Sequence, residues 1–194
     1  MNFPTDPQLD IPRRSPNLEP EKVLSAAFRL LDEVGFSGLT LRRLAARLDV
    51  KAAALYWHFK NKQDLVDQLA AKIILDEFHK VRHLMDDANW NTVLTITATG
   101  LRDALRRYRD GALTIASADI NRTGASESEI YVMRRLQEEG FSPELASLAL
   151  FSITRYTLGF VFEEQAEPRH PDHPVSFDEC LELILAGISQ KIAK

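Results

Sequence analysis

The 194-residue sequence has very little cysteine, since Cys180 is the only one. A single cysteine excludes an intrachain disulfide and is typical of a reducing cytosol, where a lone thiol is usually a small buried hydrophobic side chain. The opening segment MNFPTDPQLDIPRRSP also lacks the apolar core that a signal peptide needs. We therefore expect a soluble, cytoplasmic protein.

Signatures of catalysis are missing as well. There is no glycine-rich phosphate loop and no serine in a nucleophile-elbow pattern, and no histidine lies near Cys180 in the sequence. Glu163 and Glu164 are adjacent, so on a helix their side chains would diverge and would not meet at one substrate atom. We do not expect an enzyme.

The sequence also lacks any convincing run that alternates between apolar and polar residues, so it predicts no β-strands. Apolar residues recur at helical spacing, and Gly35–Phe36 and Asn61 with Asp64 predict a helix end and a capped helix start. The sequence therefore predicts an all-α fold, with helices over residues 20–34, 40–48, 52–59, 61–85, 90–108, 111–118, 126–140, 143–165 and 176–192.

These helices predict two domains. Two short helices joined by a tight turn at Asp49–Val50 and braced by longer ones are typical of a helix-turn-helix. We expect a flexible arm over 1–19, which carries four prolines, and a three-helix helix-turn-helix DNA-binding domain over 20–66. Residues 67–194 then form a helical ligand-binding and dimerisation domain.

Positive charge is scarce overall but concentrated locally. The formal net charge is −4, yet residues 39–62 hold six basic side chains and one acid, Asp49. Residues 71–194 hold fourteen basic and nineteen acidic side chains. A basic patch on an acidic body is typical of a DNA-binding module, and the overall charge conceals it.

The run LTLRRLAARLDVKAAALYWHFKNKQDLVDQL, residues 39–69, resembles the TetR family of bacterial transcriptional repressors. Three later stretches resemble the ligand-binding domain of the tetracycline repressors in that family: Tyr108–Ala112, Glu139–Ser142, and Thr157–Gly159 with Glu163 and Gln165. The resemblance implies a homodimer that binds a palindromic DNA operator and is released by a small-molecule effector. A transcriptional activator, or a ligand-independent DNA-binding protein of the same fold, is the alternative.

The resemblance also implies which residues contact DNA. In that family the third helix enters the major groove, while the starts of the second and fourth helices meet phosphates. We expect the aromatic rings at 56–58 to pack against the first and fourth helices and to present polar edges to the DNA backbone. The implied DNA-binding residues are Thr40, Arg42, Arg43, Lys51, Ala52, Ala54, Tyr56, Trp57, His58 and Lys62.

Ala52, Ala53 and Ala54 depart from the family, in which polar residues often read bases at these positions. Methyl groups form no hydrogen bonds, so base recognition would use contact with thymine methyls, Arg42 or Lys51, and DNA shape. No operator sequence follows from this segment.

The effector site departs from the tetracycline repressors too. There a histidine after the YRDGA segment ligates magnesium, whereas Ile115 occupies that position here and cannot bind a metal. We expect an apolar cavity with a few polar groups, no metal and no cofactor. The residues that the resemblance places at the ligand are His79, Thr97, Ile115, Val132 and Glu163.

His79 and His83 are four residues apart, a spacing that can bind zinc, but no third ligand is evident and a solvated pair is the alternative. We expect His170 and His173 to be exposed in a loop. That loop is short, which predicts a reduced lid over the cavity.

Residues 145–162 contain only one charge, Arg155, and their apolar residues surround the predicted helix. A run of this length and composition could span a membrane. Arg155 and the interspersed serines, threonines and Tyr156 argue against that interpretation. A partner subunit that covers this helix and the last one would form a four-helix interface. An ordinary intrachain core is the alternative.

Overall fold

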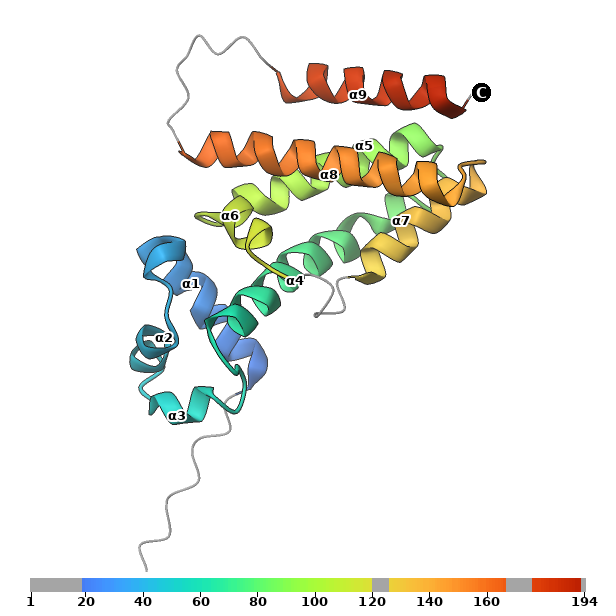
Figure 1. The fold of residues 1–194 in the computed structure, drawn as a ribbon. Helices are drawn as coiled ribbons and strands as arrows, with labels where there is room; N and C mark the ends of the chain where they lie inside the picture. Colours follow the sequence, from blue (N-terminus) through green and yellow to red (C-terminus); the bar gives the residue numbers. More distant parts are fainter. Residues whose placement is uncertain (1–18, 120–125, 167–175, 193–194) are drawn as a thin grey trace, which may run out of the picture.

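The computed structural model describes residues 19–119, 126–166 and 176–192 (Figure 1). All regular structure within these ranges is helical, which confirms the all-α fold. Residues 1–18 of the predicted arm over 1–19 lie outside the described residues, as does the loop with His170 and His173 that is predicted to form a reduced lid.

The helix-turn-helix unit consists of the first three helices and the start of the fourth. Their bounds are α1 Pro20–Gly38, α2 Leu41–Arg47, α3 Ala52–Leu55 and α4 Lys62–Val81. The predicted helix end at Gly35 is confirmed, because Gly35 has φ 70° and ψ 175°, which interrupt the helical conformation. Only three further residues of α1 follow it.

Side-chain caps define the short helices. Thr40 accepts a hydrogen bond from the Arg43 amide at 3.2 Å, and Asn61 accepts one from the Asp64 amide at 2.9 Å, as the sequence predicts. Between α2 and α3, Asp49 takes a left-handed conformation with φ 52°, which aspartate tolerates better than most residues. The chain turns sharply there and directs α3 away from α2.

The third helix is shorter than predicted, because it ends at Leu55 and not at residue 59. Leu55 and Phe59 are both buried, and the Phe59 amide donates to the Leu55 carbonyl at 2.8 Å. Residues 56–58 form turns between these two anchors. One helical turn is therefore enough to bring both anchors into the core.

Helix α4 connects the two halves of the molecule. It ends at Val81, before the predicted end at 85, and a single 3₁₀ turn, η1 Arg82–Leu84, follows. The domain boundary that we expect at 66–67 falls inside this continuous helix. A rotation of α4 would consequently be felt in both halves.

Five helices build the C-terminal half: α5 Trp90–Arg106, α6 Gly111–Ala116, α7 Ser126–Glu138, α8 Pro143–Ala166 and α9 Phe177–Ile192. Helix α8 packs against α5, α6, α7 and α9 (Figure 1). Two clusters of buried apolar side chains result, one centred on the helix-turn-helix unit and one on the C-terminal helices.

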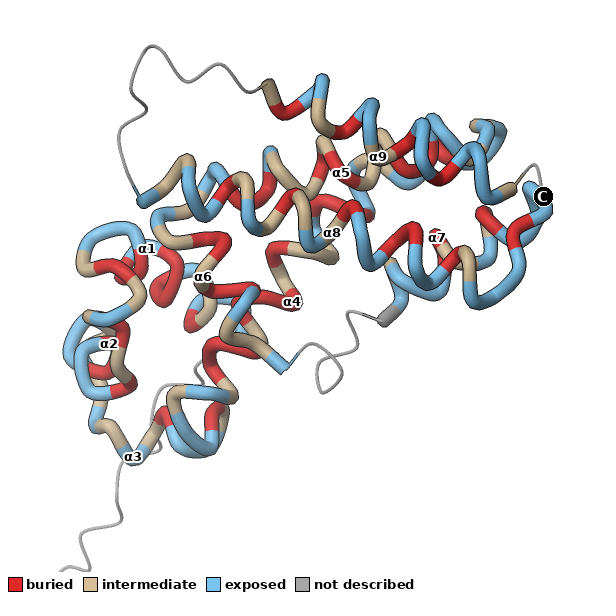
Figure 2. The backbone as a smooth tube through the Cα atoms, turned by 45° about the horizontal axis from the view of Figure 1, so that its top comes forward, coloured by how far each residue is buried: buried red, intermediate tan, exposed pale blue. Residues whose placement is uncertain are grey.

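The outer faces of α8 and α9 expose large apolar side chains, and exposed positions recur along both helices (Figure 2). Leu148, Phe151, Phe162 and Leu183 are all at least half exposed. By length and composition α8 alone among the described helices could cross a membrane, although such a finding is weak evidence because core helices of soluble proteins pass the same test. An apolar surface of this kind suits a partner subunit.

Candidate functional site

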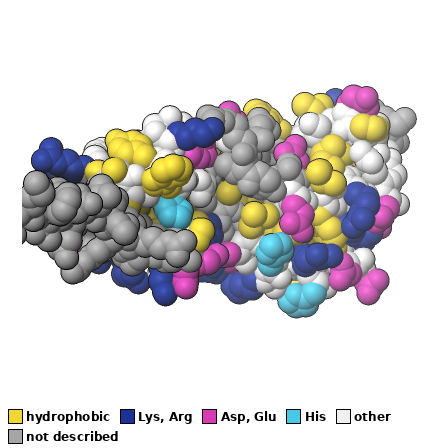
Figure 3. All heavy atoms as spheres, turned by 90° about the horizontal axis from the view of Figure 1, so that it is seen from below, with side chains coloured by type: hydrophobic (Ala, Val, Ile, Leu, Met, Phe, Trp, Pro, Cys, Tyr) yellow, Lys and Arg dark blue, Asp and Glu magenta, His cyan; other side chains and the backbone are white. Residues whose placement is uncertain are grey.

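The surface formed by α2 and α3 carries the side chains that the sequence predicts to contact DNA. Arg42, Arg43 and Lys51 are exposed, and in the view from below Lys and Arg side chains border the end of the molecule where these helices lie (Figure 3). Ala52 and Ala54 are partly buried, whereas Ala53 between them is exposed. The α3 surface thus combines small side chains with a cationic border.

The expectation that the aromatic rings pack against α1 and α4 is wrong for two of them. The side chain of Trp57 is 91% exposed and that of Tyr56 is 58% exposed, while His58 is partly buried. The cause is the short α3, which turns residues 56–58 outward between the buried Leu55 and Phe59. A tryptophan that is almost fully exposed to solvent is unusual on a surface without a binding partner and typical of a binding interface.

Lys62 lies at the start of α4, but its ammonium group has partners inside the protein. Its Nζ atom donates to the Phe36 carbonyl at 2.9 Å and lies 4.6 Å from the centre of the Phe36 ring. The ammonium therefore ties α4 to the end of α1. To contact a DNA phosphate, the ammonium would have to bind it in addition to the Phe36 carbonyl and ring, or break these two contacts.

Two further arginines of the basic segment also have partners. Arg43 donates to the Gly38 carbonyl at 3.0 Å, and Arg47 pairs with Glu33 at 2.5 Å. The hydrogen bond from Arg47 lowers the pKa of the Glu33 carboxyl. Arg47 thus braces α2 against α1, which leaves Arg42 and Lys51 as the most accessible of the predicted cationic contacts.

A cavity of about 400 Å³ lies in the C-terminal half. Residues of α4, α5, α6, α7 and α8 line it, and most of these side chains are apolar. Its volume and its few polar groups are typical of a small-molecule site. This cavity is the candidate effector site.

Three of the five predicted ligand residues line the cavity: Thr97, Ile115 and Val132. The other two, His79 and Glu163, do not line it and are exposed. Nε2 of His79 lies 3.6 Å from a Glu127 carboxylate oxygen. Both predicted positions rested on resemblance alone, and the turn of α4 directs His79 away from the cavity.

Sequence reasoning missed the most deeply buried charge in the cavity wall, Glu77. Its neighbours on the same face of α4 are Ala70 and Ile73, both buried. An acid on an otherwise apolar helical face is costly unless it is paired or functional, so this pattern could have identified Glu77. Its nearest cation, Arg107, lies thirty residues away, directly after the end of α5, and was not recognisable as its partner.

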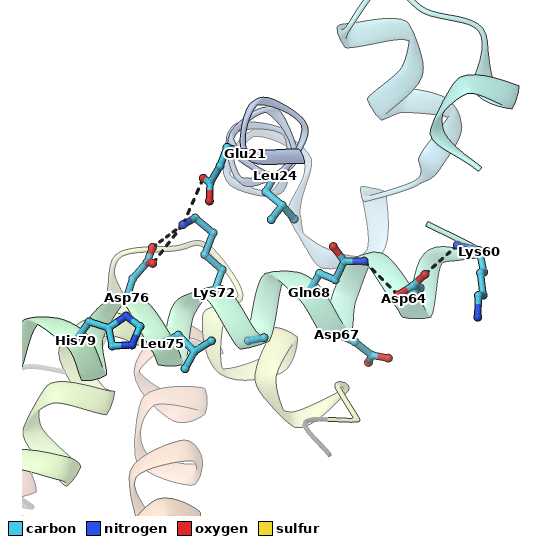
Figure 4. A pocket seen from close by; sticks show the side chains of 11 residues that line it. Glu21, Leu24, Lys60, Asp64, Asp67, Gln68, Lys72, Leu75, Asp76 and His79 are labelled. Atoms are coloured by element: carbon cyan, nitrogen blue, oxygen red, sulfur yellow. Dashed lines mark hydrogen bonds and ion pairs between the residues drawn. The ribbon is translucent and has the colours of Figure 1, made fainter. Parts of the chain in front are cut away.

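A second hollow lies between α1 and α4 (Figure 4). Lys72 spans it and pairs with Glu21 at 3.5 Å and Asp76 at 3.1 Å. At its other end Asp64 accepts from the Lys60 amide at 2.9 Å. These mutual pairings make the hollow a charged groove between two helices, less suited to an apolar effector than the cavity.

Helix α6 links the cavity to the helix-turn-helix unit. Before its first residue, Asp110 accepts from the Phe36 amide at 2.7 Å, and the Arg109 amide donates to Asp32 at 3.0 Å. After its last residue, the Ser117 carbonyl accepts from Gln63 at 2.8 Å. The last turn of this helix contributes Ile115 to the cavity wall, and residues on both sides of the helix are attached to the unit that carries α3.

No described residues form a group of three or more histidine, cysteine, aspartate or glutamate side chains that could hold a metal ion. Ile115 is buried at the cavity wall, where a metal would need a nitrogen or oxygen donor. Among the described residues, the position of Ile115 therefore offers no ligand to a magnesium-bound effector.

Comparison with known proteins gives two family matches. Residues 23–69 match bacterial regulatory proteins of the tetR family, and residues 84–176 match the tetracyclin repressor-like C-terminal domain. The tetracycline repressor class A from transposon 1721 of Escherichia coli is 45% identical over 152 residues, which cover 77% of this chain and 68% of the relative.

Solved structures agree over nearly the whole chain. A class A TetR in complex with 5a,6-anhydrotetracycline and magnesium has a TM-score of 0.70 and 38% identity, and covers 91% of this chain and 98% of its own. BioQ with its natural double-stranded DNA operator has a TM-score of 0.70 and 29% identity, and covers 89% and 99%. One relative therefore binds an effector and another binds DNA with the same architecture.

Proposed function

Because this chain belongs to the TetR family of bacterial transcriptional regulators, we propose that it is a homodimeric repressor, released from a palindromic operator by a small-molecule effector. Its role is regulatory and not catalytic, and it acts in the cytoplasm. The observation that carries this proposal is the physical link, through α6, between the cavity and the helix-turn-helix unit.

For the DNA complex we propose that the start of α3 faces the major groove. Lys51, Ala52 and Ala54 then lie near the bases, while Thr40, Arg42 and Arg43 approach one phosphate strand through the start of α2. The exposed Tyr56 and Trp57, with His58, follow the sugar–phosphate backbone. Lys62 contributes only if its ammonium also reaches a phosphate from its place beside Phe36.

For the effector we propose a compound that binds without a metal. Thr97, Ile115 and Val132 line the cavity. Of these, Ile115 occupies the position where the resemblance expects a metal-binding histidine. The class A relative solved with magnesium consequently differs from this chain in its effector chemistry.

The mechanism couples the two sites through α6 and α4. A ligand that displaces Ile115 moves α6, and the contacts of α6 transmit this movement to Phe36 and Gln63. The two α3 helices of a dimer must match successive major grooves, so a small change in their separation weakens DNA binding. A coupling of about 1–3 kcal/mol between the two sites is enough to change occupancy strongly.

Fluorescence anisotropy with duplex DNA from upstream of the protein's own gene tests the proposal. We expect Arg42→Ala and Lys51→Ala each to weaken binding and to reduce the salt dependence by about one unit of slope, because each removes one positive charge from the surface that faces the DNA. Lys191→Ala, which changes an exposed lysine of α9, is the matched control. Unchanged salt dependence in both variants, with the dimer intact, would contradict the proposed surface.

A further inference from the structure

Among the described residues of the cavity wall, Glu77 is the only carboxylate that lies within the protein interior, at 4% exposure. It projects from α4 toward Gly100 of α5, which also lines the cavity. A Cβ atom at position 100 would lie 3.5 Å from Glu77 Cγ and 3.7 Å from Oε1, which is ordinary van der Waals contact, so Gly100 lies directly beside the carboxyl group.

The partners of Glu77 come from the protein surface. Arg107 Nη2 lies 2.7 Å from Oε2, and Lys80 Nζ lies 3.3 Å from Oε1. The side chains of Arg107 and Lys80 are 45% and 60% exposed. Arg107 Nη2 is within ion-pair distance of Oε2, but among the described residues no group donates a hydrogen bond to this oxygen. A buried carboxylate oxygen thus keeps its hydrogen-bonding capacity, which is costly unless a ligand uses it.

The other charges of the cavity lie at its exposed rim. Asp119 and Glu129 are the acids there, and Arg155 is the one base that the structure describes in the lining. Arg107 and Lys80 balance the charge of Glu77, so the net negative charge of the described lining comes from the rim, where two acids face one base. This field attracts cations and repels anions, and it acts more strongly on groups that have left water.

From these observations we propose that the effector is an amphipathic organic cation, with an apolar body and a protonated amine that donates to Glu77. The apolar walls hold the body, and the buried carboxylate forms a charge-assisted hydrogen bond with the ammonium. The inference rests on the proposed function in one respect, that this cavity is the effector site.

Isothermal titration of the full-length dimer with three matched probes tests this inference: (naphthylmethyl)ammonium, naphthylmethanol and naphthoate. We expect the ammonium to bind most tightly and the carboxylate most weakly. Glu77→Gln keeps the shape of the side chain and should weaken ammonium binding at least about tenfold, while the neutral alcohol binds as before. Glu179→Gln, an exposed acid of α9 outside the cavity, should change neither.

Arg107→Gln separates a binding role of Glu77 from a structural one. Without Arg107 the carboxylate has one competitor fewer, so ammonium binding should become tighter. Weaker ammonium binding in both variants would overturn the inference, because the pair would then act only as a link between α4 and α5. Preferential binding of naphthoate would overturn it as well.

The same preparations are tested for operator binding, and thermal unfolding of each variant shows whether it is folded. Operator binding that persists while no ammonium probe binds would overturn the inference and leave the proposed repressor standing. A wild-type protein that does not bind the operator would instead contradict the proposed function.

Discussion

The DNA-facing surface and the cavity are assembled in different ways. All the residues proposed to contact DNA fall between Thr40 and Lys62, on consecutive short elements. The cavity wall draws on five helices, from Ile74 in α4 to Leu158 in α8. Local spacing decides which side chains the first surface exposes, whereas long-range packing decides what the cavity contains. The first can consequently be altered one residue at a time, and the second is sensitive to the position of whole helices.

The largest effect should come from the core beneath the DNA-facing surface. Phe59 is buried and Trp57, two residues before it, is almost fully exposed. We expect Phe59→Ala to lower the free energy of unfolding by about 3–5 kcal/mol. Trp57→Ala should change it by less than about 0.5 kcal/mol. Urea denaturation of both variants measures the difference. Similar losses of unfolding free energy would show that the exposed Trp57 side chain stabilises the fold as much as the buried Phe59 does.

The junction between the two regions should be next in sensitivity. Asp110→Ala leaves the Phe36 amide without its acceptor and places alanine at φ 56°. We expect a loss of about 2–3 kcal/mol in unfolding free energy, together with weaker coupling between ligand and DNA. Asp110→Asn, which can still accept the hydrogen bond and tolerates this φ, is the control. Equal losses for the two variants would rule out this hydrogen bond as the cause.

Trp57 should affect DNA binding without affecting the fold. Its exposed ring makes Trp57→Ala cost about 1–2 kcal/mol of operator affinity, the usual range for an aromatic side chain that becomes buried at an interface. Anisotropy titration at fixed salt measures this change. Wild-type affinity in the variant would place the DNA away from the turn after α3.

Lys62 and Lys60 lie on the same surface, but only the ammonium group of Lys62 is described as binding another part of the protein. Lys62→Ala removes a hydrogen bond and a cation–π contact with Phe36, so we expect it to destabilise the fold by about 1 kcal/mol. Lys60→Ala should leave stability unchanged, because the Lys60 side chain is exposed. If Lys62→Ala also lowers the salt dependence of operator binding, the lysine contacts a phosphate as well.

The smallest effect should come from the cavity wall. Ile115→Val removes one methyl group from a side chain that faces open volume, so the loss should stay below about 1 kcal/mol. Operator affinity without effector should be unchanged. A loss of several kcal/mol in thermal unfolding would show that the wall is packed as tightly as the core beneath α3.

The sequence was a good guide wherever neighbouring residues determine the structure. The caps at Thr40 and Asn61 and the helix end at Gly35 depend on side chains within a few residues, and all three predictions are confirmed. The predicted length of α3 was wrong, because helical spacing alone does not show that one helical turn is enough to bury both Leu55 and Phe59. The exposure of Tyr56 and Trp57 follows from that difference.

The cavity was less predictable because its chemistry depends on contacts between distant helices. Resemblance placed Thr97, Ile115 and Val132 at the cavity, but it also suggested His79 and Glu163, which lie elsewhere. No local pattern pairs Glu77 with Arg107, since their approach depends on how α4 crosses α5. An acid on an apolar helical face was the available signal, and it indicated Glu77 but not Arg107.

The attachment of α6 at both ends has a consequence for how effector recognition can change. The described connections that this helix makes to Phe36 and Gln63 involve backbone groups and side chains outside the cavity wall. Substitutions in the walls from α5, α7 and α8 would therefore alter which molecule is accepted and leave this connection intact. Sensors for new compounds could be built on this scaffold by redesigning the walls from α5, α7 and α8 and keeping those from α4 and α6.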